Sequence, residues 1–371
     1  MRWDTTKISV VTLHAVVNYG SALQAYATQR IFESLGLETQ IIDYRREAIL
    51  SRSVRQILKG SGSMKEKLKG LLLKPSYDRG RKVFDTFLSE TLNLTEQRYT
   101  YDDDFERWPL TSDIFCTGSD QVWNSGWHDG IPHPFYLSFV RKGKKISFAA
   151  SFGKDRLSDD EKPVVRELLS TYDAISVREA DGLNILRDLG FSEAVHVLDP
   201  TVALDPLEWL AISEKRVVKA KYILIYQLCN NADFDRYAVR LAREKGLKLI
   251  RLCIRYDQLR KPGHGVVLPP VERFVSLVRH AEYVLTDSFH CTAFSIMMHK
   301  QFVSFYPNKY ASRLKSILDL TGLRERLIED YADTEIIDRT IPYERIDPIL
   351  AAERNKTMRF LRKAIDIQEE K

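Results

Sequence analysis

The stretch Thr286–Lys300, TDSFHCTAFSIMMHK, follows the short apolar run AEYVL and passes into a helical pattern from Ala293 onward. Three polar side chains, Asp287, Ser288 and His290, therefore lie where an apolar strand gives way to a helix. In open parallel α/β sheets, ligands bind outside the carboxyl ends of the strands. The stretch thus predicts a strand–helix unit with a binding site at its strand end.

The same alternation runs through most of the 371 residues. Strand-like runs in the first half are KISVVTLHAV, TQIIDY, DIFCTGSDQVW, KKISFAAS, AISVRE and VHVLDP, and those in the second half are YILIYQLC, LKLIRLCI, GVVL, EYVLTDS and QFVSFYP. Helical patterns separate them, which predicts right-handed crossovers and mostly parallel sheets with helices on both faces. The chain also exceeds the length at which single cores stop growing. We therefore expect an α/β fold with two Rossmann-like domains that face a cleft.

The domain limits are expected where this pattern restarts. A segment with prolines and several charges suits a linker near residues 205–218. We place an N-terminal domain at 1–210, a C-terminal domain at 211–345, and a last helix at 346–371 that can pack on either domain.

One region, residues 51–82, departs from the alternation. It is rich in Lys and Arg and has leucines at helical spacing around a GSGS break. One interpretation is a solvated helical insertion. The other is a basic amphipathic surface that contacts anionic lipid, as in peripheral enzymes.

The composition argues against several classes of function. A net charge of +5 favours anionic small molecules or an anionic surface, but it is too diffuse to indicate DNA or RNA binding. The four cysteines match neither a disulfide framework nor a zinc site, and no His, Asp or Glu cluster has metal-ligand spacing. No run is long enough to span a bilayer, and the first residues do not form a signal peptide. We expect a cytoplasmic protein that needs no metal.

A second strand end lies in LHAVVNYGSALQAYA. Asn18 and Gly20 precede a helix there, with Ser21 as the expected N-cap, and free backbone N–H groups at this point can hold an anion. The alternative is a glycine needed only for the turn. The segment is neither a GxGxxG motif nor a P-loop, so it indicates no dinucleotide or triphosphate site.

A third strand end lies in CTGSDQVWNSGWHDG. Ser119 and Asp120 end the strand, and Trp123, Asn124 and Trp127 follow. An aspartate beside tryptophans suits sugar recognition, because aromatic rings stack on sugars while polar groups fix their orientation. The alternative is that these residues cap and pack.

The fourth strand end lies in AISVREADGLNIL, where Arg178 ends a strand and Glu179 opens a helix. An arginine that faces a cleft can bind carboxylate or phosphate with two hydrogen bonds, or it can pair with a neighbouring acid. His290, in the opening stretch, has an ordinary pKa of about 6.5, so it can act as a general acid or bind phosphate. The alternative is a satisfied core histidine.

Five motifs in this order resemble the polysaccharide pyruvyl transferase family over roughly residues 8–325: NYGSALQAYA, TGSDQVWN, SFAASFGK, SVRE, and TDSFHCTAFS with SRLKSIL after it. The resemblance implies a bacterial cytoplasmic enzyme with a GT-B-like domain arrangement, in the cytoplasm or at the inner face of the membrane. Such an enzyme transfers a pyruvyl group from phosphoenolpyruvate to a sugar and forms a cyclic ketal. The acceptor would be a lipid-linked or nucleotide-linked precursor of a surface polysaccharide, and no cofactor is implied.

The resemblance also suggests site residues. His290 and Asp120 would be catalytic, as the acid and as the base for sugar hydroxyls. The donor-binding residues would be Arg178, Ser288, His290, Lys309 and Arg313, and the acceptor-binding residues Asn18, Tyr19, Gly20, Ser119, Asp120, Trp123 and Asn124. Some members carry an arginine where this chain has Ser288, and Cys291 replaces a common glycine. Lys309 or Arg313 could supply the second positive charge.

Two other functions stay open. A glycosyltransferase that uses a nucleotide sugar can be built on the same two-domain cleft, because one fold supports many reactions. A non-catalytic glycan-binding protein would fit the serine at position 288.

Overall fold

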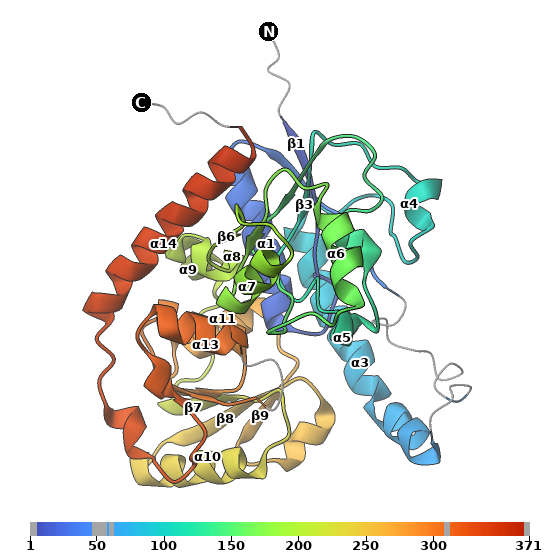
Figure 1. Cartoon of the computed structure of the whole chain (residues 1–371). Coiled ribbons are helices and arrows are strands. Elements are labelled where there is room, and N and C mark those ends of the chain that lie inside the picture. The colour runs from blue at the N-terminus through green and yellow to red at the C-terminus, as the bar shows by residue number, and fades with distance from the viewer. Residues whose placement is uncertain (1–5, 47–57, 59–62, 308–311, 367–371) are drawn as a thin grey trace.

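The computed structural model describes residues 6–46, 58, 63–307 and 312–366. Two parallel sheets, one from each half of the chain, lie apart from one another with helices packed around and between them (Figure 1). The predicted α/β fold with two Rossmann-like domains is confirmed.

The N-terminal sheet is built from short parallel strands. Four of them, β1 (Lys7–Val11), β2 (Glu38–Ile41), β3 (Ile114–Thr117) and β4 (Lys144–Ser147), pair in the order β2-β1-β3-β4. Two shorter strands, β5 (Ser176–Val177) and β6 (Val195–His196), pair with each other. Single bridges from Ile146 to Ala174 and from Ala150 to Val177 place β5 next to β4. Every residue of β3 is buried, as expected for a parallel strand covered on both faces.

The C-terminal sheet has six parallel strands in the order β12-β11-β10-β7-β8-β9. They are β7 (Tyr222–Tyr226), β8 (Lys248–Cys253), β9 (His264–Val267), β10 (Tyr283–Thr286), β11 (Gln301–Phe305) and β12 (Leu327–Ile328). The opening stretch of the sequence analysis is therefore β10 followed by a helix, as predicted.

The α-helices are α1 (Tyr19–Ser34), α3 (Met64–Thr91), α4 (Asp104–Arg107), α5 (Ser125–His128), α6 (Glu161–Leu169), α7 (Ala180–Asp188), α8 (Pro200–Ala203), α9 (Pro206–Ile212), α10 (Ala232–Lys245), α11 (Val271–Arg279), α12 (Phe289–Met297), α13 (Ser312–Leu320) and α14 (Tyr343–Ala364). Short 3₁₀ helices are η2 (His133–Tyr136), η3 (Tyr256–Arg260), η4 (Arg324–Arg326) and η5 (Glu335–Asp338). Within the described ranges, no helix is long and apolar enough to cross a membrane.

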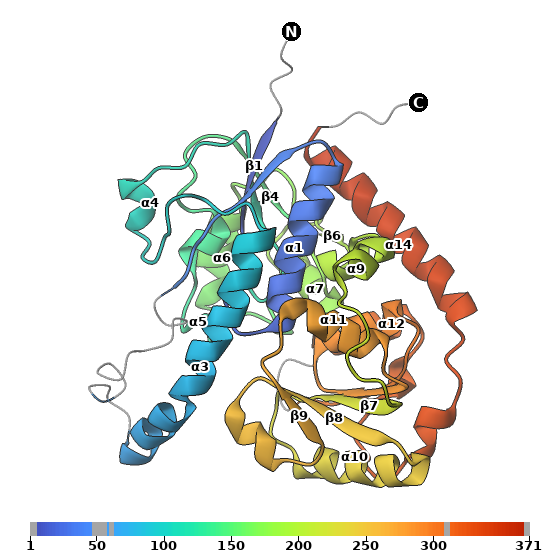
Figure 2. The ribbon, with the colours of Figure 1, turned by 180° about the vertical axis from the view of Figure 1, so that it is seen from behind.

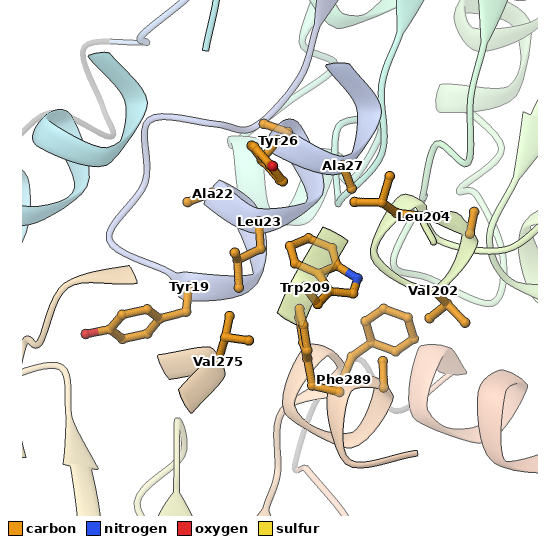
Figure 3. Close-up of a cluster of buried hydrophobic side chains, with 14 of the residues drawn as sticks. Tyr19, Ala22, Leu23, Tyr26, Ala27, Val202, Leu204, Trp209, Val275 and Phe289 are labelled. Atoms are coloured by element: carbon orange, nitrogen blue, oxygen red, sulfur yellow. The ribbon is translucent and has the colours of Figure 1, made fainter. Parts of the chain in front are cut away.

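A continuous apolar core joins the two domains. Figure 3 shows Leu23 of α1 and Trp209 of α9 packed beside Val275 of α11 and Phe289 of α12. The Trp209 indole N–H donates to the carbonyl oxygen of Thr201 at 3.0 Å, so its one polar group is satisfied. The segment 205–218, where we expected the linker, begins with α9, and Trp209 of this helix packs in the core between the domains.

The last helix returns to the first domain. Figure 2 shows α14 running from the C-terminal sheet up along the N-terminal domain. Near its start, the Tyr343 hydroxyl donates to the carbonyl oxygen of Lys300 at 2.5 Å. Near its end, the hydroxyl of Thr357 accepts from the backbone N–H of Leu198 at 3.1 Å. The helix therefore ties both domains together.

We predict that Trp209→Ala lowers the free energy of unfolding by about 3–5 kcal/mol, because it removes a fully buried ring from this shared core. Leu207→Ala on the same helix is the matched control, since Leu207 is 68% exposed and should change stability by less than about 0.5 kcal/mol. Urea unfolding of both variants measures the difference. Equal losses of unfolding free energy in the two variants would contradict this role of Trp209 in the shared core.

Candidate active site

Polar residues that follow β3, β5, β6 and β10 meet where the two domains face each other. Asp120 follows β3 in a left-handed conformation, with φ at 72°. Arg178 follows β5 directly, and Asp199 caps α8 after β6. His290 lies in the first turn of α12, after β10. The predicted convergence of strand ends is therefore present.

Arg178 is the centre of a buried ion cluster. Its side chain has no exposed surface, and its guanidinium donates to Asp199 at 2.6 Å and to Asp120 at 3.0 Å. Its Nε lies 3.9 Å from the carboxylate of Glu179. The ring of Phe289, from the other domain, lies 5.0 Å from the guanidinium carbon. The ion-pair interpretation of Arg178 is thus the one that the structure shows.

Burial and pairing act in opposite directions on these groups. Burial disfavours the charged carboxylates of Asp120 and Asp199, but Arg178 outweighs it and holds the pKa of both below the usual range. For Glu179, burial prevails and raises the pKa. Asp120 and Asp199 are therefore charged at neutral pH.

His290 completes the cluster from the C-terminal domain. Its Nε2 lies 3.9 Å from an Asp199 oxygen and has no hydrogen-bond partner among the described residues. Burial lowers the pKa of His290 to about 4, and this outweighs the nearby carboxylates. The ring is therefore neutral at pH 7 in the unliganded site.

The backbone of Gly20 packs directly against His290. A Cβ built on Gly20 would lie 1.9 Å from Nδ1 of the imidazole and 2.1 Å from Cγ, so only glycine permits this approach. Gly20 lies in the first turn of α1, and the helix is capped by Asn18, which accepts from the Gly20 N–H at 2.9 Å. The expected N-cap, Ser21, instead donates to Asp120 at 2.5 Å. Gly20 is thus needed for contact between the domains rather than for a turn.

Arg313 on α13 is the incompletely paired cation of the cluster. One guanidinium nitrogen lies 3.9 Å from Asp120, and its Nε has no partner among the described residues. Its side chain is 14% exposed, and burial lowers the pKa of Arg313 to about 10. The Oγ of the preceding residue, Ser312, is likewise buried without a partner in the described chain. The described part of the chain thus leaves hydrogen-bonding capacity unused at Arg313 and Ser312.

A cavity of about 940 Å³ adjoins this cluster. Its walls come from both domains: α5 and the segment before α6 on one side, and Tyr306, Ser312 and Lys315 on the other. Its charged lining residues are Lys154, Arg156 and Lys315 together with Asp155, Glu161 and Asp181, and Lys154 pairs with Glu161 at 2.9 Å. Gly153 connects the wall to the cluster, because its N–H donates to Glu179 at 3.4 Å. The cavity is large enough for a small anion together with a sugar.

The structure places several predicted site residues in structural positions. The Trp123 ring is fully buried and stacks on Tyr136 at 5.3 Å, so it cannot stack on a sugar. Asn124 caps α5 and is also buried. The Tyr19 hydroxyl donates to the Pro269 carbonyl oxygen at 2.8 Å, within the core between the domains.

Two further donor assignments concern Ser288 and Lys309. Ser288 caps α12 and accepts from the Cys291 N–H at 3.4 Å, which explains a serine at this point. Lys309 lies outside the described residues. Asp287, beside the cap, accepts from the backbone N–H groups of Leu228 and Cys229 at 2.7 Å each. The polar tip of β10 thus serves mainly to position the strand end and α12.

Ser119 lies inside the cluster, where its hydroxyl donates to Asp199 at 2.9 Å. Asp199 itself was not predicted, although VHVLDP has the same form as the other strand ends: an aspartate directly after an apolar run. No group of three or more His, Cys, Asp or Glu in the described ranges has an arrangement that could hold a metal ion.

The sequence profile of one family, polysaccharide pyruvyl transferase, matches residues 18–309, which is well over half of the chain. The chain belongs to the polysaccharide pyruvyl transferase family. No curated protein matches it. The matched range contains the residues of the cluster up to His290, and Arg313 follows four residues after its end.

Solved structures confirm the GT-B-like fold of this family member. A Listeria monocytogenes protein regarded as a UDP-N-acetylglucosamine 2-epimerase matches with a TM-score of 0.56 and 10% identity, covering 98% of each chain. S. aureus MnaA with UDP matches with a TM-score of 0.52 and 13% identity, covering 99% of each chain. The UDP-GlcNAc 2-epimerase of Neisseria meningitidis bound to UDP-GlcNAc matches with a TM-score of 0.50 and 12% identity, covering 97% of this chain and 100% of that one. At these identities the likeness concerns the fold alone.

We predict that Gly20→Ala destabilises the protein and that His290→Ala relieves much of this loss. The imidazole accounts for the two closest contacts of the new Cβ, and only the His290 Cβ, at 2.7 Å, is left in the double variant. A double-mutant cycle in urea should therefore give a coupling of about 1–3 kcal/mol. If the stability losses of the two single variants simply add in the double variant, the result would contradict the contact between Gly20 and His290.

We also predict a pH dependence of stability that involves His290. An unfolded chain protonates this histidine near its ordinary pKa of about 6.5, whereas the folded chain resists protonation until about 4. This contribution to stability is therefore fully present above pH 6.5 and is lost as the pH falls toward 4. Urea unfolding between pH 7 and 4 should show a shallower decline for His290→Gln than for the wild type. If the unfolding free energies of the wild type and His290→Gln fall equally over this pH range, the result would contradict a buried neutral imidazole.

Proposed function

We propose that this family member transfers the pyruvyl group of phosphoenolpyruvate to a sugar of a surface polysaccharide precursor and forms a cyclic ketal. The observation that carries the proposal is the incomplete pairing of Arg313. Its long, 3.9 Å contact to Asp120 and its unpartnered Nε leave a guanidinium available for an anion, next to a cavity between the domains. Arginine binds carboxylate and phosphate groups with two parallel hydrogen bonds.

A negatively charged donor needs a cation that the cluster does not fully pair, and Arg313 is such a cation. Two guanidiniums, Arg178 and Arg313, face two charged carboxylates, Asp120 and Asp199. The donor adds about −1.5 to −2 on its phosphate, as well as a carboxylate. In the cavity wall, Lys154 is paired with Glu161, so Arg156 and Lys315 are the cations that could approach the donor, beside Asp155 and Asp181. We infer that Arg178 positions the two aspartates, whereas Arg313 contacts the donor.

Donor binding also favours protonation of His290, which can then transfer this proton. The imidazole is neutral in the unliganded site, and an adjacent anion favours its protonated form by raising its pKa. Protonated His290 can then transfer a proton to the methylene carbon of phosphoenolpyruvate. The methylene becomes a methyl group, and the neighbouring carbon becomes an oxocarbenium-like centre.

Two sugar hydroxyls complete the reaction. The first attacks the oxocarbenium-like carbon, and Asp120, which lies in the cluster with Ser21 and Arg313, accepts its proton and returns it to His290. Phosphate then leaves, the second hydroxyl attacks the same carbon, and its proton departs with the phosphate. One hydroxyl proton thus replaces the proton that was transferred to carbon, and the other is released. The products are a cyclic ketal and inorganic phosphate.

Isothermal titration tests the donor. We predict that the protein binds phosphoenolpyruvate and that Arg313→Ala weakens this binding by about tenfold or more, because it removes a charge-assisted contact. Arg324→Ala is the matched control, since Arg324 pairs with Asp319 on the exposed surface and should leave binding unchanged.

Binding of uridine diphosphate without phosphoenolpyruvate would instead favour a nucleotide-sugar glycosyltransferase. Phosphate release with a panel of galactosides then tests the reaction. Equal lack of release by the wild type and His290→Ala would favour a glycan-binding protein without catalytic activity.

A further inference from the structure

The first turns of α3 project from the body of the protein. In Figure 1 this end of the helix extends beyond the neighbouring elements. The buried residues of α3 begin at Leu73, and none lies between Met64 and Leu72. These nine residues extend about 13 Å along the helix axis. The helix start is well formed, because Ser63 and Glu66 make a reciprocal capping box.

The second half of α3 anchors this projection to both domains. The Ser76 hydroxyl accepts from the Tyr256 N–H at 2.9 Å, in the C-terminal domain. Phe84 packs on Tyr19 of α1 with ring centres 5.0 Å apart. The exposed end therefore continues from a helix half that is fixed in the core between the domains, with Pro75 just before that half.

The projecting end carries an apolar ridge. Met64, Leu68 and Leu72 are 79%, 57% and 70% exposed, and they follow one another at intervals of four residues. At 100° per residue, these three and half-buried Leu71 lie within an arc of about 100° on the helix. Exposed apolar side chains gathered on one strip of a helix mark an interaction surface.

Lysines flank the ridge on both sides. By the same helical geometry, Lys65 and Lys69 lie along one edge, and Lys67 and Lys74 along the other, where Lys74 also pairs with Asp78. Glu66, the acidic residue of the first turn, lies on the opposite side of the helix from the ridge. An apolar strip bordered by lysines is the pattern of helices that lie in the interface of an anionic bilayer, since lysine stems cover apolar surface while their ammonium groups reach the lipid phosphates.

We propose that the ridge of Met64, Leu68, Leu71 and Leu72, with its four flanking lysines, docks the protein on an anionic lipid surface. A bilayer fits this surface better than a second copy of the chain, because two such ridges face to face would bring their lysines together and repel. The proposal does not depend on the donor or on the chemistry at His290. It would bring the protein to a surface that can carry lipid-linked acceptors.

Co-sedimentation of the full chain with vesicles tests this proposal. We expect the wild type to sediment with phosphatidylcholine vesicles that contain phosphatidylglycerol, and much less with phosphatidylcholine alone, with binding that weakens as salt is added. Leu68→Ser/Leu72→Ser and Lys65→Gln/Lys69→Gln should each lower the bound fraction by about fivefold or more. Leu207→Ser, at a leucine exposed to the same degree as Leu72, is the matched control and should bind like the wild type.

Three results would overturn the proposal. One is the absence of wild-type binding to anionic vesicles. Another is that both ridge variants bind anionic vesicles as well as the wild type does, when thermal unfolding shows that each variant is folded. The third is a dimer in light scattering that the leucine variant converts to a monomer while vesicle binding stays unchanged, because the ridge would then be a contact between copies.

Discussion

The burial of Arg178 among carboxylates is the constraint on which the site depends. A guanidinium with no exposed surface is tolerated only when its charge is compensated, and Asp120 and Asp199 provide this from two other strand ends. The ion pairs therefore fix the ends of β3, β5 and β6 relative to one another. Phe289 covers the guanidinium from the second domain, so the same residue also contributes to the joint between domains.

The joint between domains and the site are parts of one packing arrangement. The core of α1, α9, α11 and α12 holds the N-terminus of α1 against the N-terminus of α12. Gly20 then contacts His290 at a distance that no other residue would permit. The imidazole loses water and is neutral as a result. In the mechanism that we propose, the imidazole stays uncharged until the donor binds, and donor binding thereby starts the reaction.

The sequence predicted the fold and the location of the site better than the roles of single residues. Alternating strands and helices require parallel sheets, and the carboxyl ends of parallel strands share an edge, so Asp120, Arg178 and His290 were expected together. The direction of a side chain after a strand depends on the local backbone, which is why the sequence left open whether Trp123 is buried or stacks on a sugar. Glycine is needed at position 20 because the backbone there contacts His290 of the other domain, and a local sequence pattern cannot show such a contact. Arg313 was considered only as a replacement for a missing charge, because nothing near it in the sequence shows how completely its partners are paired.

We propose that Arg313 binds the donor and that Arg178 stays paired within its ion cluster. A crystal structure of the protein with phosphoenolpyruvate is the most direct measurement of this claim. We predict donor oxygens within hydrogen-bond distance of the Arg313 guanidinium, next to the cavity between the domains, with Arg178 still paired to Asp199. Donor density away from Arg313, or no donor density under conditions in which uridine diphosphate occupies the cavity, would contradict it.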